Sequence, residues 1–134
     1  MSRVVAVLYF VLLLTGATAA FWLAAELARE RKCVQYQLAE ETSDDKHWTG
    51  ILVIEDCGSP FGGAEFVITL RSSAGSNAGE AVRVFEASAE QGIDKPRVIW
   101  TEARKLQIDV PVGMTIDKLV SQYKGIEIRT APLQ

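Results

Sequence analysis

Hydrophobic and polar positions divide the chain into one long apolar run and a series of short alternating segments. No residue between Val4 and Ala25 carries a charge. As a helix rising about 1.5 Å per residue, these 22 residues would span about 33 Å, enough for a hydrocarbon core of about 30 Å. Backbone polar groups inside lipid must be satisfied within the segment, which favours a helix. The run predicts a single transmembrane helix within an N-terminal anchor segment, residues 1–32, that ends in a charged juxtamembrane turn.

The same run also has the layout of a cleaved export signal. A short positive start that contains Arg3 precedes an apolar stretch, and Ala17 and Ala19 have the A-x-A spacing of a cleavage site. Cleavage after Ala19 would release a secreted or periplasmic protein. The apolar run continues through Ala25, which is longer than a cleaved signal needs and favours an uncleaved anchor. Both alternatives target the rest of the chain to a membrane.

Residues 33–134 are predicted to form one exported β-rich domain, because most of this region alternates with period two. Its apolar segments are short, rich in β-branched and aromatic residues, and bounded by turn residues. Such spacing is typical of antiparallel meanders and not of parallel βαβ units. We expect a mainly β (α+β) fold with six or seven strands in a mostly antiparallel sheet or small sandwich. The expected strands lie in segments 33–40, 48–56, 64–71, 80–87, 96–103, 105–111 and 125–130.

One segment, residues 114–125, departs from this rhythm. Ile116, Leu119, Val120 and Tyr123 have the i, i+3, i+4, i+7 spacing of a single helical face. Thr115 precedes this face as a candidate cap, and Gly125 follows it as a candidate left-handed terminator. The pattern predicts one short C-terminal helix packed on the sheet.

Charge excludes some classes of partner and leaves the membrane orientation open. The chain has a net charge of −3 and a pI of about 5.2, and residues 33–134 alone carry −5. A nucleic-acid binder would need a basic surface, so none is expected. Arg3 precedes the apolar run and three basic residues follow it, so the positive-inside rule mildly favours a cytoplasmic C-terminal domain. The cysteines favour the opposite orientation.

The chain contains two cysteines, Cys33 and Cys57. In an exported domain an even number of cysteines indicates a disulfide, and two buried free thiols are the alternative. The bond would close a loop of 25 residues and contribute about 3.5 kcal/mol by the chain-entropy relation. A metal site would need more ligands than these cysteines and His47, the single histidine, so no metal or cofactor is expected.

Three motifs occur in the region that follows the anchor. They are Cys33, the triplet Asp56-Cys57-Gly58 at the end of a strand, and the late pattern V-x-W-x-x-x-x-x-L-x-I that begins at Val98. Together they resemble those of an uncharacterised family of small bacterial proteins that are exported or membrane-anchored, often as lipoproteins. The resemblance covers roughly residues 33–130, and it implies a β domain on the outer side of a bacterial membrane. The chain differs from the lipoprotein members because no lipobox cysteine follows the segment LLLTGA, residues 12–17.

These features favour a non-enzymatic envelope protein that is tethered by Val4–Ala25 and acts as an interaction or structural module. Its partner would be another envelope component, and no small-molecule ligand is expected. The loop after Cys57 is the candidate contact surface, because Phe61 stands among glycines; covering the disulfide is the competing role for Phe61. The candidate loop residues are Ser59, Pro60, Phe61, Gly62 and Gly63.

Two other functions remain open. An inhibitor or immunity-type protein acting on an envelope enzyme suits a small disulfide-closed β domain. A hydrolase with paired carboxylates is the enzymatic alternative, although the acidic residues have no distinctive spacing and no catalytic residue is nominated. The carboxylates available for such a pair are Asp44, Asp45, Glu55, Asp56 and Glu65.

Overall fold

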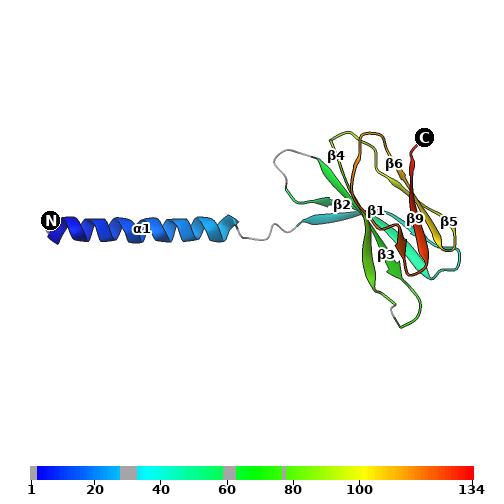
Figure 1. The fold of residues 1–134 in the computed structure, drawn as a ribbon, viewed down its shortest axis with the longest axis horizontal. Coiled ribbons are helices and arrows are strands. Elements are labelled where there is room, and N and C mark those ends of the chain that lie inside the picture. The colour runs from blue at the N-terminus through cyan, green and yellow to red at the C-terminus, as the bar shows by residue number, and fades with distance from the viewer. Residues whose placement is uncertain (1–2, 28–32, 59–62, 77) are drawn as a thin grey trace. The chain divides into compact units, whose positions relative to one another are not determined.

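A computed structural model describes residues 3–27, 33–58, 63–76 and 78–134 of the protein (Figure 1). Its internal contacts divide the chain into two units, Met1–Lys32 and Cys33–Gln134. The first unit contains one helix and the second contains every described strand. A mainly β fold after an N-terminal apolar helix is therefore confirmed.

The helix α1 (Arg3–Leu27) carries almost the whole apolar run, and it is long and apolar enough to cross a membrane. Its polar hydroxyls are satisfied locally. Thr15 donates to the backbone oxygen atoms of Val11 and Leu12, and Thr18 donates to that of Leu14 at 3.1 Å. These bonds satisfy both threonine hydroxyls of the helix within the helix itself.

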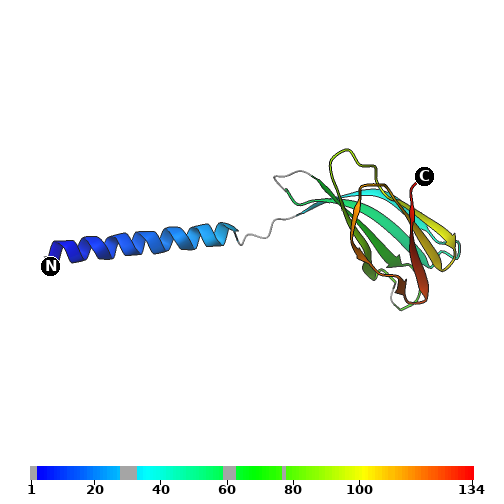
Figure 2. The same cartoon turned by 45° about the horizontal axis from the view of Figure 1, so that its top comes forward.

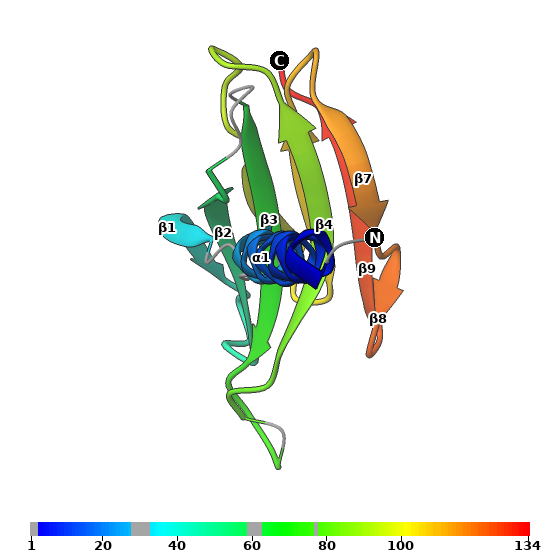
Figure 3. The ribbon, with the colours of Figure 1, turned by 90° about the vertical axis from the view of Figure 1, so that its left-hand side faces the viewer.

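The second unit is a sandwich of two sheets (Figures 2 and 3). The first sheet has the order β1-β2-β3-β4-β7, and every neighbouring pair is antiparallel. The second sheet has the order β5-β6-β9-β8, in which β6 and β9 form a parallel pair. The strands are β1 (Val34–Thr42), β2 (Trp48–Asp56), β3 (Ala64–Ser72), β4 (Ala81–Ala89), β5 (Arg97–Glu102), β6 (Lys105–Val110), β7 (Thr115–Leu119), β8 (Gln122–Tyr123) and β9 (Ile126–Pro132).

The prediction of a C-terminal helix over residues 114–125 is wrong, and the number of strands in the described residues is nine, above the expected six or seven. The helical spacing belongs to β7 and β8. β7 pairs with β4, where Leu119 lies opposite Phe85. Gly125 does adopt a left-handed conformation, with φ +79°, but in the turn that joins β8 to β9. A helix this short is marginal by itself, so pairing with the open edge of β4 overrides the local pattern.

The core lies between the two sheets. Alternate residues of β3 face inward, and Ile68 and Leu70 are fully buried together with Phe85 of β4. The aromatic residues differ in burial: Phe66 and Phe85 are buried in the core, whereas Trp48 and Trp100 are partly buried and pack against it. The largest apolar contributions of the second sheet are Leu106, Ile108, Ile126 and Ile128.

Close contacts hold the sheets together at the end that contains the β1–β2 turn. A Cβ atom added to Gly50 of β2 would lie 3.1 Å from a methyl group of Val98 on β5. The indole nitrogen of Trp100 donates to the backbone oxygen of Glu41 at 2.8 Å, which links β5 to β1. Trp48 and Tyr123 add an edge-to-face ring pair with centroids 6.0 Å apart.

A buried carboxylate strengthens the β5–β6 hairpin. Asp109 is 4% exposed and accepts hydrogen bonds from Arg97 Nη2 at 2.8 Å and Gln107 Nε2 at 2.7 Å. Burial raises the pKa of Asp109, but the hydrogen bonds from Arg97 and Gln107, with the charge of Arg97, outweigh it. The pKa of Asp109 therefore lies below its usual value of 3.8.

Arg97→Met should lower the free energy of unfolding at pH 7 by about 1–2 kcal/mol, because Asp109 loses a charged partner that solvent only partly screens. The folded pKa of Asp109 is depressed, so the contribution of the pair is complete above about pH 4 and is lost as the pH falls through the folded pKa. The difference between variant and wild type should therefore narrow in urea unfolding at about pH 2.

Lys105→Met is the matched control, because it removes one charge from an exposed ion pair with Glu102 in the same hairpin. Its effect should stay within about 0.5 kcal/mol at either pH. If the free energy of unfolding of Arg97→Met stays below that of the wild type by the same amount at pH 7 and at about pH 2, the assigned role of the pair is contradicted.

Candidate functional site

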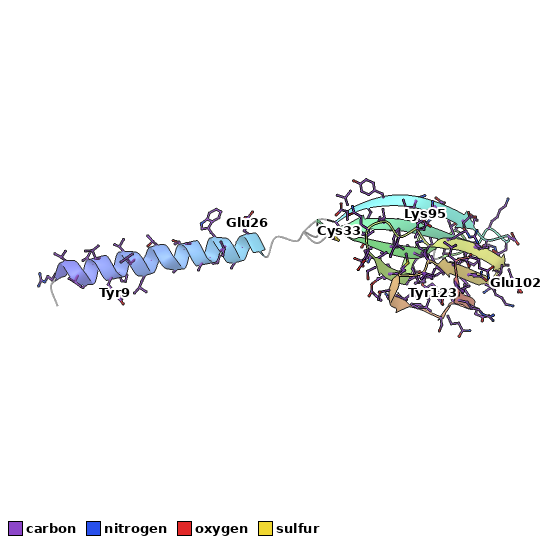
Figure 4. All side chains as sticks on the ribbon, turned by 90° about the horizontal axis from the view of Figure 1, so that it is seen from above. Tyr9, Glu26, Cys33, Lys95, Glu102 and Tyr123 are labelled. Carbon is purple, nitrogen blue, oxygen red and sulfur yellow. A yellow bond between two sulfur atoms is a disulfide. The ribbon has the colours of Figure 1, made fainter. Side chains whose placement is uncertain are left out.

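The structure joins Cys33 and Cys57 in a disulfide with an S–S distance of 2.04 Å, the pairing expected from the sequence (Figure 4). The bond continues the β1–β2 ladder by one position beyond the pair Val34–Asp56. It therefore fixes the start of β1 at the point where the chain enters the sandwich.

Part of the predicted contact loop can be placed. Ser59, Pro60, Phe61 and Gly62 lie outside the described residues, so their role stays a prediction. Gly63 is described and has a left-handed backbone with φ +100°, and an added Cβ would lie 3.3 Å from the backbone oxygen of Ala89. Both features favour glycine at this end of β3.

Two of the candidate carboxylates come together beside the disulfide. Oxygen atoms of Glu55 and Glu65, with the sulfur of Cys57, lie within 4.8 Å of one another. Cys57 is already bonded to Cys33, so its sulfur is not a thiolate ligand for a metal. The three atoms therefore do not form a metal-binding set of the usual kind.

Glu55 is also held by partners on two other strands. The amide nitrogen of Gln35 on β1 and the guanidinium of Arg83 on β4 both donate to Glu55 Oε1. The side chain of Arg83 crosses β3 on the outer face of the first sheet to reach Glu55. Val67 of β3 lies on the same face and is only 1% exposed. Glu86 extends the cluster, because its Oε1 lies 3.5 Å from Arg83 Nη1 and 3.8 Å from Lys118 Nζ. Glu55 thus has a structural role in tying the strands together.

Of the other candidate acids, Asp56 follows Glu55 at the end of β2 and accepts a hydrogen bond from the backbone N–H of Gly58 at 2.9 Å, whereas Asp44 and Asp45 are distant from the pair. Asp44 and Asp45 lie in the β1–β2 turn, at the opposite end of the hairpin from the disulfide. There Ser43 donates a hydrogen bond to Asp45 at 2.6 Å, and this bond, with that from the backbone of His47, lowers the pKa of Asp45. His47 Nδ1 lies 3.3 Å from Asp45. The five acids and the histidine therefore do not converge on one reaction centre.

A groove of about 1080 Å³ lies across the strand ends at the disulfide. Its apolar lining comes from β2, β3 and β4 and from the segment that follows β4. Its acidic lining comes from Glu55, Asp56, Glu65 and Glu90, and no lysine or arginine of the described residues lines it. The apolar residues of the lining are Ile54, Ala64, Phe66, Ala89 and Ile93.

An uncovered part of the first sheet adjoins the groove. Tyr36 lies opposite Ile54 in the β1–β2 ladder and Val34 lies opposite Asp56, so all four share the inner face. The second sheet contacts β1 near Glu41, and it leaves Val34 51% and Tyr36 57% exposed. We call Val34, Tyr36 and the groove lining the open end of the sandwich.

The sequence shows the alternation of Val34, Tyr36 and Leu38 but not that this face is uncovered. A register shift between Gln37 and Ala39 changes the phase of β1, so that Ala39 and not Leu38 pairs with Leu52 and packs against the core. Coverage depends on where the second sheet ends, which no local pattern encodes.

No protein-family model, curated protein or solved structure matches the chain. The chemistry of its own residues is therefore the basis for a function.

Cys57→Ser should lower the free energy of unfolding by about 2–5 kcal/mol, because the bond constrains a sequence separation of 24 residues in the unfolded chain. Urea unfolding under oxidising conditions would measure the change. Wild-type protein treated with a reductant is the control and should unfold at the same urea concentration as the variant. Equal midpoints for the variant and the oxidised wild type would show that the disulfide does not stabilise the fold.

Proposed function

We propose that the protein is a non-enzymatic interaction module of a bacterial envelope, held at the membrane by an uncleaved α1 with its sandwich on the extracytoplasmic side. The observation that carries the interaction role is the open end of the sandwich. Exposed Val34 and Tyr36 continue into an apolar groove there, and soluble domains rarely leave such a surface without a partner.

The disulfide supports the extracytoplasmic side. Reducing compartments rarely maintain disulfides, whereas a bacterial periplasm does. This favours export over the orientation suggested by the few basic residues that flank α1. The bacterial assignment depends on the resemblance of the cysteine and tryptophan motifs to exported bacterial proteins.

The arrangement of the acids supports a role in binding. A carboxylate pair that performs acid–base catalysis needs one group free to donate and one free to accept a proton. Glu55 is instead engaged by Arg83 and Gln35, and the acids of the β1–β2 turn lie at the other end of the sheet.

The location is tested by expressing the full chain in a bacterial host with a C-terminal alkaline phosphatase, which is active only outside the cytoplasm. We expect phosphatase activity, retention in membranes after alkaline carbonate extraction, and an intact mass that includes residues 1–19. A cytoplasmic fluorescent reporter at the same position is the control and should stay dark. Fluorescence of the cytoplasmic reporter without phosphatase activity would contradict the extracytoplasmic location. An intact mass that lacks residues 1–19 would contradict the uncleaved anchor.

The interaction is tested with a photo-crosslinking amino acid placed at Tyr36 of the full chain in living cells. We expect one discrete crosslinked adduct in place of a broad set of nonspecific products, because Tyr36 lies on the proposed contact surface. Glu102 is the matched control, since it is also exposed but lies at the end of β5, in the second sheet (Figure 4). Identical adduct patterns at the two positions would argue against a specific surface at Tyr36.

A further inference from the structure

We infer that the open end of the sandwich binds a short apolar peptide segment that carries lysine or arginine. This inference rests on the proposed interaction function and specifies its partner chemistry. It concerns the described residues alone, and it uses neither the loop at residues 59–62 nor the placement of α1.

The apolar part of the surface is continuous across strands. The register places Tyr36, Ile54 and Phe66 in one row of the inner face, from β1 through β2 to β3. Ala64 lies opposite Ala89 in the next row, and Ile93 lines the same groove. A segment lying across these rows could bury side chains on several strands at once, which is where hydrophobic binding energy comes from.

The extent of the apolar surface beyond the groove favours a peptide over a small molecule. Small-molecule sites usually enclose about 300–1,000 Å³ and bury most of the ligand. The groove reaches about 1080 Å³ and continues onto exposed Val34 and Tyr36. An extended segment can fill the groove and still contact Tyr36.

Charge selects among the possible occupants. Glu65 and Glu90 line the groove, and neither side chain forms an ion pair with another described residue. An anionic lipid surface or a second copy of this acidic domain would bring like charge to these carboxylates. Lysine or arginine on the partner would instead compensate them, which gives both attraction and selectivity.

The surface is also held ready for binding. The disulfide fixes the start of β1 next to Tyr36, and Gln35 is tied to Glu55 on β2. A partner therefore orders little of this surface when it binds, so less free energy is lost on association.

The test uses the full chain in nanodiscs of zwitterionic lipid and two fluorescein-labelled octapeptides, one alternating valine with lysine and one alternating valine with glutamate. Fluorescence anisotropy should show saturable binding of the lysine peptide and at least tenfold weaker binding of the glutamate peptide. Empty nanodiscs measure binding to lipid. Equal binding of both peptides, or a lysine-peptide signal that empty nanodiscs reproduce, would overturn the inference.

Two variants locate the site. The double variant Glu65→Gln/Glu90→Gln and the single variant Tyr36→Ser should each weaken lysine-peptide binding about tenfold, from the loss of charge and of apolar contact respectively. Asp44→Asn is the matched control, because it removes a carboxylate at the opposite end of the β1–β2 hairpin and should leave the affinity unchanged. Equal urea midpoints of all variants would establish that each one folds.

Unchanged affinity in the double variant, or equal loss in Asp44→Asn, would overturn the assignment of the site. Self-association of the full chain that Tyr36→Ser abolishes would overturn it in favour of a second copy. The crosslinking experiment separates this inference from the proposed function. A specific adduct at Tyr36 without lysine-peptide binding would leave the interaction function standing and reject the basic-peptide chemistry.

Discussion

The covalent link between Cys33 and Cys57 is the constraint on which the arrangement of the exposed surface depends. β1 is an edge strand, and burial holds it only weakly: of its residues, only Ala39 packs against the buried core. The Trp100–Glu41 hydrogen bond secures the far end of the strand. At the near end the disulfide replaces the packing that the strand lacks, and so it keeps Val34 and Tyr36 presented beside the groove.

The charged residues of the first sheet act with this link. Glu55 connects β1 through Gln35 to β4 through Arg83, and Glu86 continues the cluster to Lys118 on β7. These contacts link β1, β2, β4 and β7 on the outer face, and the contact between Glu55 and Arg83 crosses β3. Exposed ion pairs contribute little singly, but Glu55 is buried, so the loss of Arg83 would leave its charge uncompensated and the loss of Gln35 would remove one of its hydrogen bonds.

The two faces of the first sheet have different consequences for function. The outer face pairs its charges within the sheet, which leaves few groups for a partner. The inner face extends past the second sheet at the disulfide end, where its apolar side chains adjoin the groove. Glu65, beside Glu55 on the outer face, and Glu90 also line this groove, and neither forms an ion pair with another described residue. These uncompensated groups and exposed apolar side chains are what support the proposed binding role of this end.

The sequence by itself determined the elements whose pattern is local and strong. The uncharged run predicted the helix, because length and apolarity decide that structure without tertiary partners. Period-two segments predicted β1 to β6 and β9, since alternation and turn residues are properties of neighbours along the chain. Two cysteines in a domain expected to be exported were sufficient to indicate their pairing.

Only the tertiary structure decided what depends on distant segments. Residues 114–125 have a helical spacing, yet β4 offers an open edge and the core accepts Val120 and Tyr123, so the segment forms β7 and β8. The acids that meet at the disulfide, Glu55 and Glu65, became distinguishable from Asp44 and Asp45 only through the register of β2 and β3. The open end has the same origin, because the coverage of Val34 and Tyr36 is set by where a second sheet stops, and sheet boundaries result from pairings between residues far apart in the chain.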